Sequence, residues 1–456
     1  MLSYRANGVV FAFACLACAG AARADKTLEE RIADLETKNL QLEKLVQAQS
    51  SKLVLEDQKL TQSIDRLKEK DAERSRLRFD GYVDFGFFAP SGNGVGFVRD
   101  VNNTQRANFP NTPWILLGDP WSTAVNSRGE PASTVGSFAI PFDNIQSGGH
   151  DTFILNEIQL NIEARIAPNA SMHATVNFLP REGSGGTLGD FFEAPYGYLE
   201  WRPWKDRDAT VEIGKYRSVF GLEYRQQESP DRTGITPSLI YRYVAGHPLG
   251  LKLRQRWPDG EHENTILNLS LQNSSSNLEE FDFGEEISGN DGKTVSGRIS
   301  HGWKAVKWAD AAEIGFSAEY GTEAKQPRDS IHAYQFDLDA QYEKRRFTVN
   351  AEAIRVVDEG AGLGVVPSLD SRGFYIIPSY RLTTQTTTYV RWEFRRATHI
   401  GETFAYVMDT ERWTAGVRYD FNPHWILKVE YLRNIERGAD PTIDNDIFTV
   451  SQVLTF

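Results

Sequence analysis

The last ten residues, 447–456, alternate large apolar and small polar side chains and end on an aromatic residue. Successive side chains of a strand point to opposite faces. The apolar and polar residues therefore lie on opposite faces of one strand: Phe448, Val450, Leu454 and Phe456 against Thr449, Ser451 and Thr455. A wall between lipid and water needs this asymmetry, so the segment predicts a strand of a transmembrane β-barrel.

The N-terminus predicts export. Arg5 gives a basic start, residues 9–16 form a short apolar core, and Ala22-Arg23-Ala24 offers a cleavage site before Asp25. This pattern is typical of a secretory signal peptide, residues 1–24. A lipoprotein anchored on Cys18 is the alternative. Both cysteines lie in this segment, so we expect neither disulfides nor thiol chemistry in the mature chain.

Charge and hydropathy exclude two classes of protein. The formal net charge is −12, and loss of Arg5 and Arg23 with the signal peptide would make it −14. Nucleic-acid binding needs basic patches, so no nucleic-acid partner is expected. No run of about 18 apolar residues follows the signal peptide, so a helical membrane span is not predicted.

Residues 25–75 carry a heptad pattern. Positions that alternate steps of four and three are mostly apolar, with charged flanks and no Gly or Pro: 28, 32, 35, 39, 42, 46, 49, 53, 56, 60, 63 and 67. This predicts an α-helical coiled coil. Asn39 in the seam favours a dimer, whereas attachment to a transmembrane barrel favours a trimer, so the sequence leaves the oligomeric state open. A single solvated helix is the alternative.

After Arg74 the period becomes two, and sixteen strand-like segments follow, from 77–88 to 446–456. Short and long links alternate between them, with long links that include 321–329 and 397–409. The sequence thus predicts an all-β fold, a 16-stranded antiparallel transmembrane β-barrel over residues 77–456. Both barrel ends fall on the short-link side, which places the coiled coil in the periplasm. A soluble β-sandwich is disfavoured because the faces opposite the apolar ones are too polar for a dry core.

One stretch carries a family resemblance. Glu212-Ile213-Gly214-Lys215-Tyr216-Arg217, then Phe220-Gly221-Leu222-Glu223 and Gly250, resembles a segment of the phosphate-selective porin O/P family, whose members are sixteen-stranded trimers. The terminal Phe456 is similar to the C-terminal signature of bacterial outer-membrane proteins. The resemblance implies a homotrimer whose third loop, 217–246 by position, folds into the lumen and narrows it.

Loop 217–246 contains a mixed set of charges that could form an eyelet: Glu223, Arg225, Glu228, Asp231, Arg232 and Arg242. A charged constriction selects solutes by sign and hydration. The alternative is a solvated outer loop with ordinary surface charges.

Strand parity predicts which charges face the lumen. The basic candidates are Lys252, Arg254, Arg256, Arg391, Arg395, Arg418 and Lys428. Acidic residues, Asp337 and Asp339 among them, are spread around the wall. A phosphate-selective pore should show an unbroken ladder of Arg and Lys, so we expect weak ion preference instead. Lys215 and Arg217 fall on the lipid face unless a bulge intervenes or their strand ends there.

Catalysis is not predicted. The eight His residues are scattered, and no Gly-x-Ser-x-Gly motif occurs. Asp337 and Asp339 could hold a cation, but a hydrated lumen wall accounts for them as well, so no metal or cofactor is expected.

The favoured function is a water-filled outer-membrane channel for passive diffusion of small hydrophilic solutes and ions. The alternative is a structural tether, in which residues 25–75 bind peptidoglycan or another periplasmic partner and the barrel anchors them in outer-membrane lipid.

Overall fold

The computed structural model describes Thr37 and, with gaps between them, residues 76–91, 99–100, 114–117, 127–128, 150–178, 192–273, 293–326, 329–359, 368–400, 404–437 and 445–456. The chain divides into two compact units, Met1–Ser75 and Arg76–Phe456. The expected signal peptide and coiled coil lie outside the described residues, apart from Thr37. In the described portion, no helix combines the length and apolarity needed to cross a membrane.

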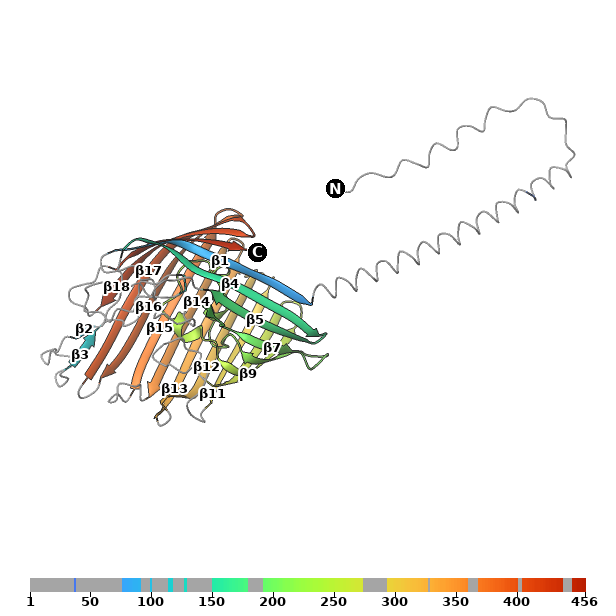
Figure 1. Cartoon of the computed structure of the whole chain (residues 1–456), viewed down its shortest axis with the longest axis horizontal. Coiled ribbons are helices and arrows are strands. Elements are labelled where there is room, and N and C mark those ends of the chain that lie inside the picture. Colours follow the sequence, from blue (N-terminus) through green and yellow to red (C-terminus); the bar gives the residue numbers. More distant parts are fainter. Residues whose placement is uncertain are drawn as a thin grey trace, which may run out of the picture. The chain divides into compact units, whose positions relative to one another are not determined.

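Sixteen antiparallel strands of the second unit form a closed barrel (Figure 1). They are β1 (Leu77–Pro90), β4 (Thr152–Ala167), β5 (Ala170–Phe178), β7 (Gly197–Trp201), β8 (Asp208–Lys215), β9 (Leu249–Asp259), β10 (Glu263–Gln272), β11 (Thr294–Lys304), β12 (Ala311–Gln326), β13 (Asp329–Lys344), β14 (Phe347–Glu359), β15 (Ser368–Arg381), β16 (Thr386–Ile400), β17 (Phe404–Asn422), β18 (Trp425–Arg437) and β19 (Ile447–Thr455). The barrel closes where β1 pairs with β19 on one side and β4 on the other. The sixteen strands expected from the sequence are confirmed.

Three short strands supplement the barrel. The first two, β2 (Arg99–Asp100) and β3 (Trp114–Leu117), pair with each other, and β3 runs parallel to residues 404–407 of β17. The third, β6 (Phe192–Glu193), pairs with β5 beyond the stretch that β7 covers.

The barrel wall is apolar outside and polar inside. On β13, Phe336 and Leu338 are 44% and 55% exposed, whereas Asp337 and Asp339 between and beside them are 2% and 1% exposed. Val295 and Ile299 of β11 are likewise exposed, and Arg298 is buried. A soluble protein buries its large apolar side chains, so this inverted pattern excludes the β-sandwich alternative.

Two expected long links are in fact continued strands. The ladder of β12 and β13 extends to the pair Gln326 and Asp329, and that of β16 and β17 to Ile400 and Ala405. The expectation of loops at 321–329 and 397–409 is therefore wrong. Backbone hydrogen bonds alone can continue a hairpin, and residues 321–329 show no apolar alternation that would mark them as strand.

Strand β8 ends at Lys215, which resolves the parity conflict at Arg217. Gly214 adopts φ +131°, and a Cβ there would lie 2.4 Å from the Gly197 carbonyl oxygen. Only glycine fits this close approach. The chain then leaves the wall, and the Arg217 guanidinium donates to the Tyr196 hydroxyl at 3.0 Å.

Candidate functional site

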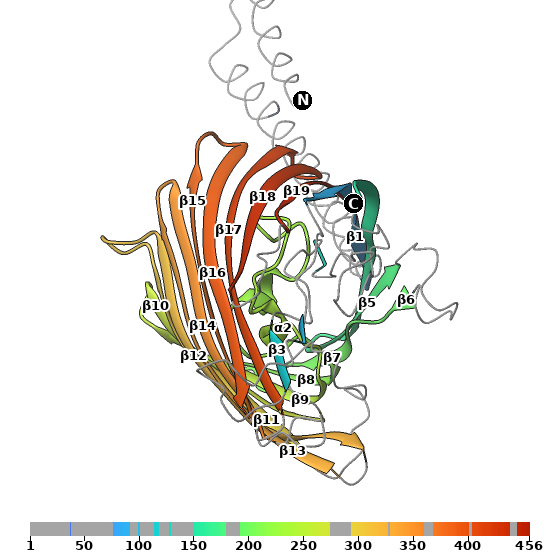
Figure 2. The same cartoon turned by 90° about the vertical axis from the view of Figure 1, so that its left-hand side faces the viewer.

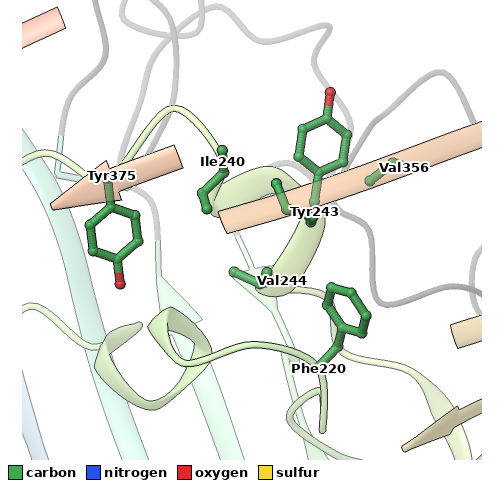
Figure 3. Packing of buried hydrophobic residues seen from close by; sticks show 7 residues of the cluster. Phe220, Ile240, Tyr243, Val244, Val356 and Tyr375 are labelled. Carbon is green, nitrogen blue, oxygen red and sulfur yellow. The ribbon is translucent and has the colours of Figure 1, made fainter. Parts of the chain in front are cut away.

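Loop 217–246 lies inside the barrel and packs on its wall. It contains the single-turn helices η2 (Glu223–Gln226) and α2 (Tyr241–Val244), and Figure 2 shows α2 within the ring of strands. An apolar cluster joins loop to wall (Figure 3), in which residues of the loop meet residues of β14 and β15: Phe220, Ile240, Tyr243 and Val244 with Ile354, Val356 and Tyr375. The alternative of a solvated outer loop does not fit this burial.

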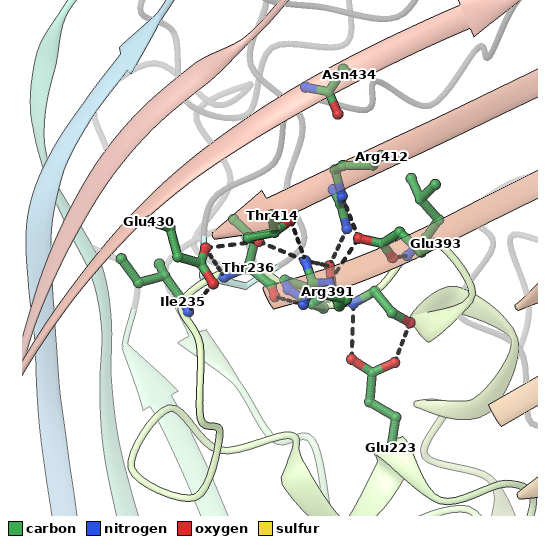
Figure 4. A network of polar contacts seen from close by, with 12 residues as sticks. Glu223, Ile235, Thr236, Arg391, Glu393, Arg412, Thr414, Glu430 and Asn434 are labelled. Carbon is green, nitrogen blue, oxygen red and sulfur yellow. Dashed lines mark hydrogen bonds and ion pairs between the residues drawn. The ribbon is translucent and has the colours of Figure 1, made fainter. Parts of the chain in front are cut away.

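Three glutamates of the wall accept backbone N–H groups of the loop. Glu352 of β14 takes those of Leu222 and Glu223 at 2.8 and 3.1 Å. Glu393 of β16 accepts the backbone N–H of Leu239 at 2.6 Å. Glu430 of β18 accepts the backbone N–H groups of Ile235 and Thr236 at 2.8 and 2.9 Å (Figure 4). Irregular backbone has no ladder to satisfy its N–H groups, so these carboxylates supply the acceptors.

Four basic side chains of the same wall donate to loop carbonyls. Arg391 reaches Thr236 O at 2.8 Å, and Arg412 reaches Pro237 O. The other two act further along the loop: Arg418 reaches Pro230 O at 2.7 Å, and Lys428 reaches Arg232 O and Gly234 O at 2.8 and 2.9 Å. The side chains of Arg412 and Lys428 are buried. These four side chains therefore hold the loop in place. The loop in turn covers the side chains of Arg391 and Lys428.

The expected eyelet residues have different environments. Glu223 is buried and accepts the Ser238 N–H at 2.9 Å, and burial raises the pKa of its carboxyl. Arg232 donates to Ile235 O at 2.9 Å and is buried. Asp231 is exposed, and Arg242 is half-buried on α2.

Two charged pairs at the edge of the loop are only partly covered. Arg217 bonds Glu228, with side chains 27% and 17% exposed. Arg225 lies 2.9 Å from Glu313 of β12, with side chains 32% and 18% exposed. Tyr196 adds a hydroxyl that donates to Glu228 at 2.9 Å. Three loop charges within reach of solvent, Arg217, Glu228 and Arg225, are thus matched by an opposite charge.

The remaining wall candidates are also mostly matched. Lys252 bonds Glu212 at 3.0 Å. Arg254 and Arg256 lie 3.7 and 3.5 Å from Asp208 near a short turn. Arg395 donates to the Tyr243 hydroxyl at 2.9 Å.

The two aspartates of β13 differ. Asp339 is bonded by Arg298 at 2.6 and 2.9 Å, whereas both carboxylate oxygens of Asp337 have no hydrogen-bond partner within the described part of the chain. In that same part, no group of three His, Cys, Asp or Glu side chains could hold a metal ion.

The wall residues around the loop include Arg298, Glu352, Glu393, Arg412 and Glu430. The sequence predicts the three glutamates as lumen-facing carboxylates but does not single out Arg298 or Arg412. Strand parity places all of them on the inward face, because each alternates with an outward apolar or aromatic neighbour such as Ile299, Trp413 or Tyr431. Parity thus identifies lumen residues, but it does not show which of them contact the loop.

Comparison with known proteins gives structural matches only. No protein-family model matches the chain, and no curated protein does either. The outer membrane channel DcaP of Acinetobacter baumannii is similar in structure, with 11% identity, a TM-score of 0.48, and coverage of 83% of this chain and 97% of that chain. A trimer form of OmpT, an outer membrane protein of Vibrio cholerae, has 9% identity, a TM-score of 0.46, and coverage of 83% and 99%. An anion-selective porin from Comamonas acidovorans has 8% identity, a TM-score of 0.46, and the same coverage. Because the sequence identities are 8–11% and the TM-scores lie below 0.5, these matches support no conclusion about function.

Proposed function

We propose that this protein is a porin of the bacterial outer membrane, a water-filled channel for passive diffusion of small hydrophilic solutes and ions. The inverted wall of the closed barrel is the observation that carries the proposal. Leu338 and its outward neighbours suit hydrocarbon, and the polar inward face suits water.

The short-turn rim supports a membrane position. Exposed tryptophans stand beside the turns on that side: Trp201, Trp204, Trp257, Trp308 and Trp425. Tryptophan is enriched where a membrane meets water, because its ring is apolar and its N–H is polar. The first and last barrel strands, β1 and β19, begin and end at this same rim, which corresponds to the periplasmic side.

Loop 217–246 forms the constriction in this proposal. Its contacts with β1, β12, β14, β16 and β18 hold it inside the lumen. The pairs Arg217 with Glu228 and Arg225 with Glu313 place charges of both signs next to each other at its edge. We therefore propose weak ion preference, and the covered positions of Arg391 and Lys428 argue against a phosphate-selective ladder.

The assembly proposals rest on sequence. The resemblance of residues 212–223 to phosphate-selective porins supports a homotrimer in outer-membrane lipid. The heptad pattern of residues 25–75 supports a periplasmic coiled coil that contacts peptidoglycan or another periplasmic partner. In this view the tether is a second role beside the channel.

Planar-bilayer recording of the full chain and of a variant lacking residues 28–67 tests these proposals. A channel predicts ohmic current in steps of three for a trimer, with a reversal potential close to zero in a salt gradient. A barrel that passes no current in both forms would falsify the channel and leave the tether. A reversal potential near the anion limit would contradict weak preference.

A further inference from the structure

Asp337 is a buried carboxylate that lacks a donor. Its side chain is 2% exposed, and neither oxygen has a hydrogen-bond partner within the described ranges. Burial of an unpaired ionised carboxylate is strongly unfavourable. Asp337 therefore holds a proton or faces a group that does.

Glu352 is the group within reach. The ladder pairs Glu352 with Asp339, so Glu352 lies one diagonal step from Asp337 on the same inward face. Glu352 is 1% exposed. Its oxygens accept the backbone N–H groups of Leu222 and Glu223. An interaction that holds the Glu352 side chain in position therefore also holds residues 222–223 of the loop.

The surroundings supply too few cations for two carboxylates. Charged and titratable groups that act on the pair come from four places: Arg298 of β11, Asp339 of β13, Tyr375 of β15 and Glu223 of the loop. Glu313 of β12 and Arg225 of the loop lie beside Arg298. Arg298 bonds Asp339 and Glu313, and Arg225 bonds Glu313 as well. Neither guanidinium has a bond to Asp337 or Glu352.

We propose that Asp337 and Glu352 share one proton at neutral pH, as a carboxylic acid hydrogen-bonded to a carboxylate, and that this proton holds residues 221–223 of the loop on the wall. A metal ion is disfavoured because the described residues offer no set of three ligands. Loss of the proton leaves two adjacent negative charges in a buried site, and their repulsion frees the loop segment.

The sign of the pH dependence follows from proton binding. The docked loop keeps a proton that the released, solvated carboxyls give up, so docking is complete at low pH and is lost as the pH rises. The docking equilibrium weakens by up to about tenfold for each pH unit between about pH 4, where the released carboxyls lose their proton, and the pH at which the docked pair loses its own.

Infrared spectroscopy of the full-length barrel in detergent tests the shared proton. The protein at pH 7 should show the carbonyl band of a buried protonated carboxyl. Asp337→Asn should abolish this band, and Asp310→Asn, at an exposed turn, should keep it. A band that persists in both Asp337→Asn and Glu352→Gln would overturn the proposal. A wild-type protein without the band would do the same, as would uptake of Ca²⁺ that depends on Asp337. Glu352→Gln gives a second route if Asp337→Asn does not fold.

The effect on current rests on the proposed channel and is measured separately. From pH 7 up to the pH at which the docked pair loses its proton, bilayer recordings of the wild type should show blocking or flickering events that rise by up to about tenfold per pH unit. Asp337→Asn should show no such rise, because its amide donates to Glu352 at every pH. An equal rise in Asp337→Asn would overturn the regulatory role. Absence of any current would count against the channel, while the infrared result would still decide the shared proton.

Discussion

Glu430 of β18 accepts the backbone N–H of Ile235 at 2.8 Å, although 195 residues separate them in the sequence. The same carboxylate takes the N–H and the hydroxyl of Thr236, each at 2.9 Å, and the hydroxyl of Tyr389. One side chain of the wall thus fixes a whole turn of the loop. The position of the proposed constriction is therefore encoded in the strands that face it.

Replacement of Glu430 should release this turn. In Glu430→Ala, the N–H groups of Ile235 and Thr236 lose their acceptor, at a cost of about 1–3 kcal/mol. Amide hydrogen exchange at these two residues should speed up by about 10- to 100-fold. Glu263→Ala, at a partly exposed position beside a short turn, is the control and should leave both rates unchanged. Unchanged exchange in Glu430→Ala would show that the turn is held by other contacts.

Lys428 should be needed for the neighbouring part of the loop. Its ammonium donates to the carbonyls of Ser229, Arg232 and Gly234, so Lys428→Met leaves three acceptors without that donor. Each buried unsatisfied group costs about 1–3 kcal/mol. Trypsin should then cut after Arg232 in the folded barrel, which the wild type should resist. Lys344→Met, at a surface turn, should stay resistant, and resistance of Lys428→Met would contradict the proposed anchoring.

The fold could be predicted from sequence because it depends on a short-range pattern. Alternation along 293–303 and 334–342 is enough to assign both faces of those segments, and the structure agrees. The hairpin ends at 321–329 were missed because strands beyond the apolar zone need no alternation.

The contacts of the site could not be predicted in the same way. Asp337 and Asp339 are two equivalent inward aspartates in the sequence, yet only Asp339 meets Arg298, which is 41 residues away. Likewise, nothing near Leu222 indicates that its N–H bonds Glu352. Such pairings depend on the register of distant strands, and local periodicity carries no information about them.

Gly221 should not tolerate a side chain. Its φ is +77°, and a Cβ would lie 2.1 Å from Glu352 Oε1, the atom that accepts the Leu222 N–H. Gly221→Ala should therefore cost about 1–3 kcal/mol in loop docking and displace Glu352. Gly197→Ala is the matched control, since a Cβ there meets nothing within 4 Å. Exchange at Leu222 should rise in Gly221→Ala alone, and equal exchange in the two variants would refute the strain argument.

A charge on the outer face should destabilise the barrel according to depth. Leu338 is 55% exposed near the middle of β13, and Leu382 is 49% exposed in a short turn. In a lipid-embedded barrel, Leu338→Arg should cost about 2–4 kcal/mol, whereas Leu382→Arg should cost about 0–1 kcal/mol. Urea unfolding from lipid vesicles measures both values. Equal costs would indicate that the outer face does not contact hydrocarbon.

His247 should make loop docking sensitive to acid. Burial lowers the pKa of its imidazole to about 3, and the nearby charges of Lys215 and Arg217 act in the same direction. The neutral ring donates from Nε2 to Gln227 Oε1 at 3.0 Å, and Gln227 in turn donates to the Ala245 carbonyl oxygen. An exposed imidazole gains its proton near pH 6.5. Below that pH, His247 therefore binds a proton in the released loop but stays neutral in the docked loop. Docking is therefore complete above about pH 6.5 and weakens by up to tenfold per pH unit as the pH falls toward 3.

Hydrogen exchange at the Ala245 amide, corrected for the intrinsic pH dependence of exchange, measures this effect. His247→Gln keeps an amide donor without a titrating group, so its protection should stay constant between pH 6.5 and 4, while that of the wild type falls. His262→Gln, in an exposed turn, should behave as the wild type. Because the proton on Asp337 and Glu352 acts in the opposite direction, loss of protection at low pH should persist in Asp337→Asn. Loss of both pH responses in a single variant would mean that one group, and not two, controls the loop.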